Sequence, residues 1–226
     1  LIQVGASTRQ PYMVAGHLIL RAKSPKFDAS FDWGIFNPHQ EDFFIDYIFG
    51  RLNYKHIVRP FKRTLGLYQK VNRSLKEFPL RLSNIQKKKL ISKLVYWAKP
   101  DNRIYRYDIF FKNCSTVIGN LLAEVINSPN SKILDQPAET TFREAGLSHL
   151  AHFPTYELFT DLVMGGVVGD RPISRRKLFF LPVAVPKLLQ EMAPNSVGVP
   201  QEILAGTDMA PVERWWSKAF GVIAMI

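Results

Sequence analysis

The sequence predicts an α+β fold in which a small antiparallel sheet packs against a helix that begins at Cys114. Two apolar runs near the N-terminus flank a turn signal, which is typical of a β-hairpin. Residues 113–126 place apolar side chains at helical intervals, and shorter segments with the same pattern extend to residue 192. Strands are therefore expected first along the chain, and additional helices in its second half.

The expected hairpin joins residues 13–20 to residues 29–36. The intervening RAKSPKFD contains a Ser-Pro pair, which favours a turn. Residues 39–49 place aromatic side chains on one face and indicate a helix. Another apolar run over residues 52–58 indicates a further strand.

The middle of the chain predicts two long helices separated by a strand. The residues SNIQ from Ser83 have capping-box spacing, and the helix that follows them ends before Pro100. Residues 104–111 (IYRYDIFF) alternate like a strand at their start. Asn113 is a favoured N-cap residue, so the next helix begins at Cys114.

Shorter helices are expected over residues 141–152, 156–164 and 186–192, the last with proline at its first position.

The final fifteen residues, VERWWSKAFGVIAMI, are aromatic and then apolar, and fit a packed terminal segment, an interfacial anchor or the start of a membrane helix. We therefore expect one main domain over residues 1–195. The C-terminal extension, residues 196–226, is a candidate membrane-proximal segment.

The composition fits a globular chain with a substantial core, since 46% of its 226 residues are apolar. No run reaches the roughly 18 apolar residues that a membrane-spanning helix needs. The sequence starts with neither Met nor the basic-then-apolar pattern of a signal peptide. It therefore suggests a processed or trimmed chain.

The net charge of +11 is concentrated in residues 59–112, which hold 15 lysine and arginine residues against 3 acidic ones. Such a segment can contact nucleic acid, an anionic membrane or an acidic ligand, or can be a solvated helix face. No nucleic-acid-binding motif accompanies it, so we expect anionic lipid headgroups as its partner and no nucleic acid.

The single cysteine, Cys114, can form neither an internal disulfide nor a zinc cluster by itself. A lone cysteine is most often a small buried hydrophobic residue. However, a cysteine in the first turn of a helix meets unpaired backbone N–H groups and the positive end of the helix dipole. Both stabilise a thiolate, and the N–H groups can also bind an oxyanion. Cys114 is therefore a candidate nucleophile.

A thiolate nucleophile needs a base, and the base needs an orienting group. His17 follows Gly16 at the start of an apolar strand, where glycine permits a close backbone approach. If the hairpin closes, His17 lies across from residues 31–33, and Asp32 is the carboxylate in that segment that can fix the imidazole tautomer. Asp32 could equally be a strand-end or turn residue. The order His, Asp, Cys reverses the usual order of papain-like enzymes.

Several motifs resemble those of the Lnb N-terminal periplasmic domain family, over about residues 3–195. They are GH at 16–17, FDWGIF at 31–36, NRIYRYDIFFKNCST at 102–116, TFR at 141–143 and FLP at 180–182. The family is similar to the circularly permuted papain-like (NlpC-like) group that includes lecithin:retinol acyltransferase. One residue departs from the pattern, because asparagine is expected more often at the position of Asp32.

The resemblance implies that permuted fold, a membrane-associated location on the periplasmic side of the bacterial envelope, and an acyl-transfer site linked to lipoprotein N-acylation. In this reading Cys114 accepts an acyl chain from a phospholipid or lipoprotein, and His17 is the base. The residues with supporting or oxyanion roles are Asn113, Tyr107 and Ser115. The candidate substrate-binding residues are Arg143 and Tyr105, with a structural salt bridge as the alternative for Arg143. Asp170 also matches the family pattern.

Two other functions stay open. The first is a cysteine peptidase or amidase that cuts cell-wall peptides, since NlpC-type peptidases share this chemistry. The second is a non-catalytic module that binds lipoprotein or membrane. An apolar tunnel ending at Cys114 would favour the acyltransferase, and an open polar groove the peptidase. No cofactor or metal is expected, because His149 and His152 lack an evident third ligand.

Overall fold

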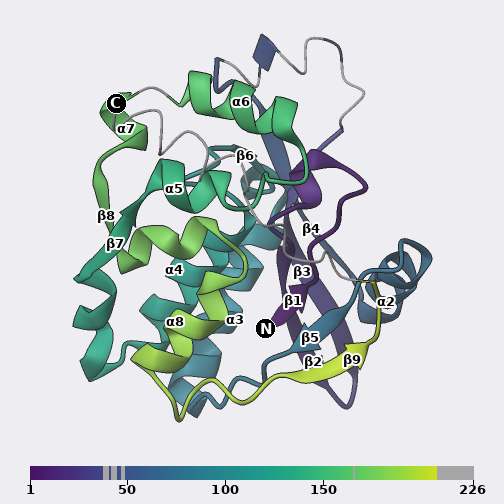
Figure 1. The fold of residues 1–226 in the computed structure, drawn as a ribbon. Helices are drawn as coiled ribbons and strands as arrows, with labels where there is room; N and C mark the ends of the chain where they lie inside the picture. Colours follow the sequence, from purple (N-terminus) through teal and green to yellow (C-terminus); the bar gives the residue numbers. More distant parts are fainter. Residues whose placement is uncertain (38–40, 42–44, 47–48, 165, 208–226) are drawn as a thin grey trace, which may run out of the picture.

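The computed structural model describes residues 1–37, 41, 45–46, 49–164 and 166–207. The fold is α+β, as the sequence predicts, with helices on both faces of an antiparallel sheet (Figure 1). Within the described residues the main sheet has seven strands, so it is larger than expected. In spatial order they are β6 (Ile104–Arg106), β4 (Asn53–Pro60), β3 (Phe27–Ile35), β2 (His17–Ser24), β1 (Ile2–Val4), β5 (Leu75–Glu77) and β9 (Gln201–Leu204).

The predicted hairpin is confirmed as β2 and β3, but its turn is tighter than expected. The two strands stay paired up to Ser24 and Phe27, which leaves two residues for the turn. Most of the segment expected as a turn therefore belongs to the strands, where Arg21 forms an ion pair with Asp28 across the hairpin. The pairing also sets Ile19 opposite Asp32, which fixes the position of this carboxylate relative to β2.

Three strand boundaries differ from the prediction. β2 begins at His17 rather than at residue 13, because a 3-10 turn, η1 (Pro11–Met13), comes first. β4 continues beyond residue 58 to Pro60. β6 covers only the start of the run 104–111, because the Asp108 carboxylate then accepts the N–H groups of two following residues and closes a turn.

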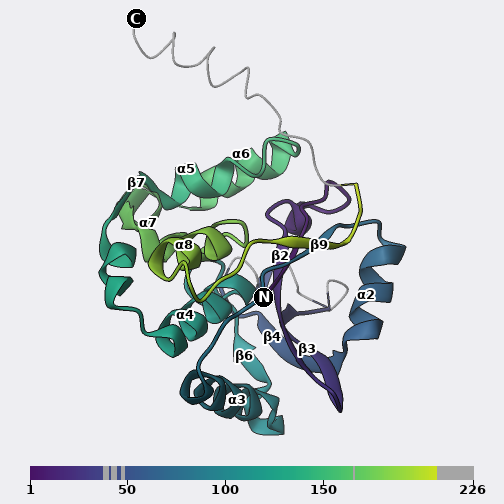
Figure 2. The ribbon, with the colours of Figure 1, turned by 90° about the horizontal axis from the view of Figure 1, so that it is seen from below.

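Helices cover the two faces of the sheet unequally (Figure 2). On one face α2 (Phe61–Lys70), which was not predicted, packs on a small apolar cluster. The other face carries the main core, beneath α3 (Asn84–Ala98), α4 (Cys114–Ile126) and α8 (Ala184–Met192). The predictions for α3, with its Ser83 capping box, and for α4 are confirmed.

Shorter elements fill the second half of the chain. They are α5 (Phe142–Leu147), α6 (Pro154–Val163) and α7 (Gly166–Gly169), the 3-10 turns η2 (Pro100–Asn102), η3 (Pro129–Asp135) and η4 (Arg175–Phe180), and a ribbon of β7 (Pro137–Thr141) with β8 (Pro172–Ser174). α5 ends well before residue 152, which had been the expected limit. α8 begins at Ala184, so Pro186 lies at its third position, where a backbone N–H has no acceptor within the helix.

The packed part of the chain extends past residue 195. β9 pairs with β5 at the edge of the main sheet, so part of the expected C-terminal extension belongs to the main fold. Most of the helix expected over 39–49, and all of the aromatic and apolar segment 212–226, lie outside the described residues.

The basic segment 59–112 does not form one surface. Its two helices, α2 and α3, lie on opposite faces of the sheet (Figure 2). Some of its charges are also paired, as Lys89 and Lys93 both contact Glu124. In the described part of the chain, no helix is long and apolar enough to cross a membrane.

Candidate active site

Asn113 fixes the start of α4 and therefore the position of Cys114. Its side-chain oxygen accepts the N–H groups of Ser115 (2.9 Å) and Thr116 (2.8 Å), and the Thr116 hydroxyl accepts the Asn113 N–H to complete a capping box. Its amide nitrogen donates to the carbonyls of Ile109 and Phe180, both at 2.8 Å. This network ties the helix start to the turn just before it and to Phe180, which is distant in sequence.

The same cap leaves the Cys114 N–H available. The N–H groups of Ser115 and Thr116 donate to the Asn113 side chain, and that of Val117 donates to the Asn113 carbonyl. Among the described residues, none accepts the N–H of Cys114. An unpaired N–H at a helix start can bind a developing negative charge. The donor lies on the residue whose sulfur would attack.

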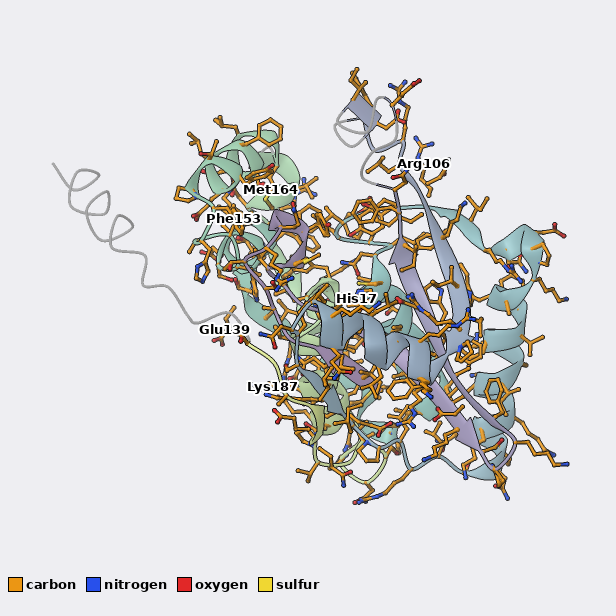
Figure 3. The ribbon with its side chains drawn as sticks, turned by 90° about the vertical axis from the view of Figure 1, so that its right-hand side faces the viewer. His17, Arg106, Glu139, Phe153, Met164 and Lys187 are labelled. Atoms are coloured by element: carbon orange, nitrogen blue, oxygen red, sulfur yellow. The ribbon has the colours of Figure 1, made fainter. Side chains whose placement is uncertain are left out.

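His17 is the first residue of β2, next to Gly16. Gly16 has a φ of +80°, and a Cβ at this position would lie 2.7 Å from the Val4 carbonyl oxygen, so only glycine fits. His17 Nδ1 lies 3.2 Å from Cys114 Sγ, and its Nε2 lies 2.7 Å from Asp32 Oδ1. Figure 3 shows His17 near the middle of the molecule, close to α2. The structure thus brings the three residues predicted from sequence into one chain of contacts.

Gly34 makes room for this arrangement. Its φ is +86°, and a Cβ there would lie 3.2 Å from the Cβ of Cys114 and 3.9 Å from Cε1 of His17. The missing side chain lets the start of α4 approach the sheet beside His17. The sequence shows Gly34 only as part of a motif, because its packing partner is 80 residues away along the chain.

Arg59 completes the site and was not singled out in the sequence. Asp32 is fully buried, and its Oδ2 accepts a hydrogen bond from Arg59 Nη2. The register of β3 with β4 brings this pair together, because Arg59 lies opposite Ser30. Ser30 and Asp32 are two residues apart on β3, so Arg59 lies on the same face of the sheet as Asp32. That register becomes known only with the fold.

The neighbouring charges favour a protonated His17. Burial lowers the pKa of His17, but the Cys114 sulfur, Tyr68 and Asp32 together raise it further than burial lowers it. The net result is a pKa well above the usual 6.5. A protonated imidazole between a sulfur and a carboxylate is the arrangement expected of a thiolate–imidazolium pair.

The supporting residues predicted from sequence have different surroundings. The Ser115 side chain is fully buried and its hydroxyl donates to the Phe180 carbonyl at 3.0 Å, so Ser115 and Asn113 both anchor the helix start. The Tyr107 ring stacks on Tyr54, with 3.9 Å between ring centroids.

Tyr105 is buried in the main core, where its ring packs edge-on against Trp97. Its hydroxyl is buried and has no hydrogen-bond partner; the backbone of Gly34 is near it but outside hydrogen-bond geometry. Burial raises the pKa of Tyr105, and the neighbouring Cys114 sulfur raises it further. The hydroxyl therefore remains protonated and can donate a hydrogen bond.

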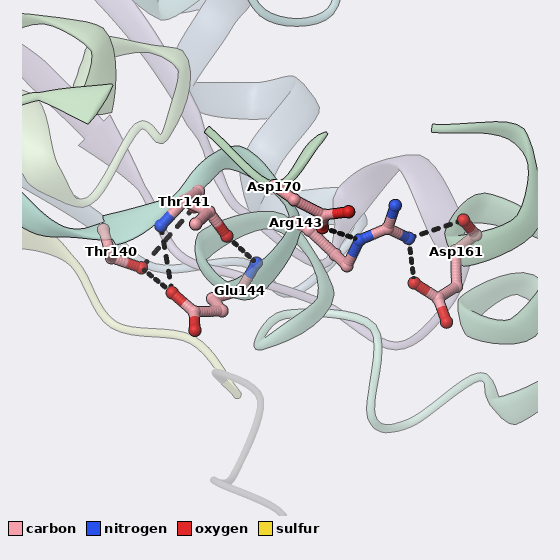
Figure 4. Close-up of polar contacts among 6 residues, drawn as sticks. All are labelled: Thr140, Thr141, Arg143, Glu144, Asp161 and Asp170. Atoms are coloured by element: carbon pink, nitrogen blue, oxygen red, sulfur yellow. Dashed lines mark hydrogen bonds and ion pairs between the residues drawn. The ribbon is translucent and has the colours of Figure 1, made fainter. Parts of the chain in front are cut away.

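Arg143 forms a structural clamp between two acidic residues (Figure 4). Its guanidinium bonds to the Asp170 carboxylate and to both the carboxylate and the backbone carbonyl of Asp161. It thereby links α5 to α6 and to the residues after α7. Of the two roles considered from sequence, the structure shows the salt bridge.

A groove of about 580 Å³ lies between α3 and α4. Its lining includes Lys93, Trp97, Phe111, Val117 and Glu124, so it is open and has mixed polarity. Neither Cys114 nor His17 lines it, although Val117 lies one helical turn from Cys114. This groove differs from an apolar tunnel that ends at the sulfur.

The described residues contain no group of three or more histidine, cysteine, aspartate or glutamate side chains placed to hold a metal ion. His149 instead contacts Ser148 and the Ala145 carbonyl, and burial lowers its pKa.

Comparison with known proteins gives one match. Residues 4–145 match the family described as Lnb N-terminal periplasmic domain. No curated protein and no solved structure matches the chain. The matched region includes His17, Asp32, Arg59 and Cys114. The chain therefore belongs to the Lnb N-terminal periplasmic domain family and is a periplasmic protein, as its motifs predicted.

Proposed function

We propose that this protein is a cysteine-dependent acyltransferase of the bacterial envelope. Cys114 would take an acyl chain from a phospholipid or lipoprotein as a thioester and pass it to an amine, such as a lipoprotein N-terminus. One observation carries the proposal: the Cys114 sulfur, at a helix start with a free N–H, contacts a histidine that is oriented by a buried carboxylate.

The first half of the reaction forms the thioester. The thiolate, whose proton resides on His17, attacks the ester carbonyl carbon. The resulting oxyanion binds the Cys114 N–H and, in our proposal, the Tyr105 hydroxyl. The carbon–oxygen bond of the ester then breaks, and the leaving alcohol takes the proton from His17.

The second half transfers the chain. The amine attacks the thioester carbonyl and gives its proton to His17, the same oxyanion donors act again, and the Cys114 thiolate leaves. The product is an amide, and the enzyme returns to its starting state. Asp32 holds the His17 tautomer through both halves without itself reacting.

The circularly permuted papain-like (NlpC-like) fold is part of this proposal. Support comes from the chain order, with the histidine and its carboxylate on a hairpin before the helix that carries the cysteine.

Contact of α2 or α3 with anionic headgroups would bring the site to its lipid substrates, and the many lysine and arginine residues of these helices support this role.

A cysteine peptidase or amidase acting on cell-wall peptides is the second candidate. The observation that favours it is the open groove beside α4, whose lining includes Lys93, Asn120 and Glu124 and could hold an extended peptide. A non-catalytic lipoprotein- or membrane-binding module, the third candidate, predicts that Cys114→Ala leaves function intact in cells.

Intact-protein mass spectrometry separates these functions. The protein would be incubated with vesicles of phospholipid or of diacylated lipopeptide, together with Cys114→Ala and an exposed-helix control, Thr155→Ala in α6. A mass increase of one acyl chain, removed by hydroxylamine and absent only from Cys114→Ala, supports the acyltransferase. No adduct with any lipid, while Cys114 still alkylates readily, would reject it in favour of the peptidase.

A further inference from the structure

We propose that Arg59 is a positioning residue that holds the Asp32 carboxylate in the orientation needed to align His17. The inference depends on the Cys114–His17 chemistry of the proposed function, but not on the identity of the acyl donor or acceptor. Arg59 reaches the reacting sulfur only through Asp32 and His17, since the contacts run from Cys114 through these two residues.

The two oxygens of Asp32 are divided between two partners. Oδ1 contacts His17 Nε2 at 2.7 Å, and Oδ2 accepts from Arg59 Nη2. A carboxylate held at one oxygen can rotate about its side-chain bonds, whereas one held at both oxygens from opposite sides has a fixed plane. Arg59 therefore determines which way Oδ1 points.

The backbone around Arg59 is itself well anchored. Its carbonyl accepts the Ser30 hydroxyl at 3.2 Å, and Ser30 also contacts Thr64 on α2. Arg59 thus lies at the junction of β4 and α2, fixed to β3 on one side and to the helix on the other. Because the Arg59 side chain is only 20% exposed, water does little to compete for its contact with Asp32.

The four groups also alternate in charge in the form that the proposed function uses. In that form a Cys114 thiolate, the His17 imidazolium, the Asp32 carboxylate and the Arg59 guanidinium sum to zero. Without Arg59, a fully buried carboxylate oxygen would lose its charged donor, and Asp32 would reorient or admit water to replace it. Either change weakens the alignment of His17.

Arg21 offers a matched control in the same sheet. It also forms ion pairs with two carboxylates, those of Asp28 and Glu77, and its side chain is 14% exposed. It has no contact with Asp32 among its described hydrogen bonds and ion pairs. Loss of Arg21 therefore reports the general effect of removing a half-buried arginine from this fold.

The sign of the change in the His17 pKa tests the proposal. If Arg59 acted only as a charge, Arg59→Met would raise the His17 pKa, because a positive neighbour would be gone. If Arg59 positions Asp32, the same variant lowers the His17 pKa, because the imidazolium loses its aligned partner. We expect a fall of about one unit and alkylation of Cys114 about tenfold slower at neutral pH.

The experiment is an NMR titration of the histidine side chains, with the His17 signal assigned from His17→Gln, combined with iodoacetamide alkylation over a pH series. Arg59→Lys should restore most of the pKa and rate, Arg21→Met should leave both unchanged, and Arg59→Met should add little in an Asp32→Asn background. An unchanged or raised His17 pKa in Arg59→Met would overturn the proposal. Neither measurement uses a lipid, so a failure to detect acyl transfer would leave the inference standing.

Discussion

At the scale of single residues, the site depends on a missing side chain as much as on reactive ones. Gly34 lies where β3 meets the start of α4, with a positive φ and almost no space for a Cβ. This one position lets a strand residue, His17, contact a residue at the start of a helix.

Gly34→Ala should therefore lower both stability and reactivity. We expect a loss of about 1–2 kcal/mol from the strained φ, and slower alkylation of Cys114 because the new Cβ displaces it from His17. Urea unfolding and iodoacetamide kinetics measure the two effects. Gly66→Ala in α2, where a Cβ meets nothing within 4 Å, is the control and should be slightly stabilising. Unchanged alkylation in Gly34→Ala would show that this contact does not limit the site.

His17 also predicts a pH dependence of stability. Its folded pKa lies above its unfolded value near 6.5, so the imidazolium contributes stability fully below pH 6.5 and loses it as the pH rises through the folded pKa. The difference in unfolding free energy between the wild type and His17→Gln should shrink over that range. Denaturant titrations between pH 6 and 10 measure it, and a difference that grows with pH would contradict the assignment.

At the scale of elements, the capping box of α4 combines a structural and a functional role. Asn113 satisfies two helix N–H groups, holds the carbonyls of Ile109 and Phe180, and leaves the Cys114 N–H free. α3 has a capping box as well, at Ser83, but in an exposed position beside the last residue of α4, where Gln86 donates to the Ile126 carbonyl.

These two caps give a matched pair of variants. Asn113→Ala should cost about 2 kcal/mol, because it removes a cap together with the side-chain hydrogen bonds to the Ile109 and Phe180 carbonyls, and it should slow alkylation of Cys114. Ser83→Ala should cost about 1 kcal/mol and leave alkylation unchanged. Thermal unfolding and alkylation rates compare them, and equal rates in all three proteins would remove the α4 cap from the site.

At the scale of the whole molecule, His56 joins the sheet to α3 inside an aromatic cluster. It is fully buried, its Nδ1 contacts the Trp97 carbonyl at 3.1 Å, and its ring lies 4.3 Å from that of Trp33. Burial lowers the pKa of His56 to about 4.

A depressed histidine pKa makes the fold sensitive to acid. The unfolded chain binds this proton near pH 6.5 and the folded chain only near pH 4, so stability falls as the pH drops through that range. We expect His56 to account for about 2 kcal/mol of lost stability at pH 5 relative to pH 7. Urea unfolding of the wild type and His56→Gln at both pH values tests this, and an equal pH effect in the two proteins would refute it.

The sequence predicted those parts of the fold whose signals are local. The hairpin, α3 and α4 each have a periodic pattern and a turn or cap within the segment itself. α2 has such a pattern too, with Phe61, Leu65 and Tyr68 at helical spacing, but its lysine and arginine residues interrupt the apolar signal. β1, β5 and β9 are only three or four residues long, too short to show alternation, and are stabilised by their neighbours.

The site residues divide in the same way, into those with a local sequence signal and those that depend on how distant segments pack. Cys114 was predicted from its helix start and Asp32 from the hairpin that carries His17, both of which are local patterns. Arg59 and Gly34 depend on the register of β3 with β4 and on the docking of α4, which no single segment encodes.

The most direct test of the account compares the alkylation rate of Cys114 at neutral pH in the wild type and in His17→Ala. The two side chains are 3.2 Å apart, so removal of the imidazole should leave the sulfur without its cationic partner and slow the reaction at least tenfold, with the fold intact by circular dichroism. Equal rates in two folded proteins would contradict the assignment of His17 as the base, and with it the proposed mechanism.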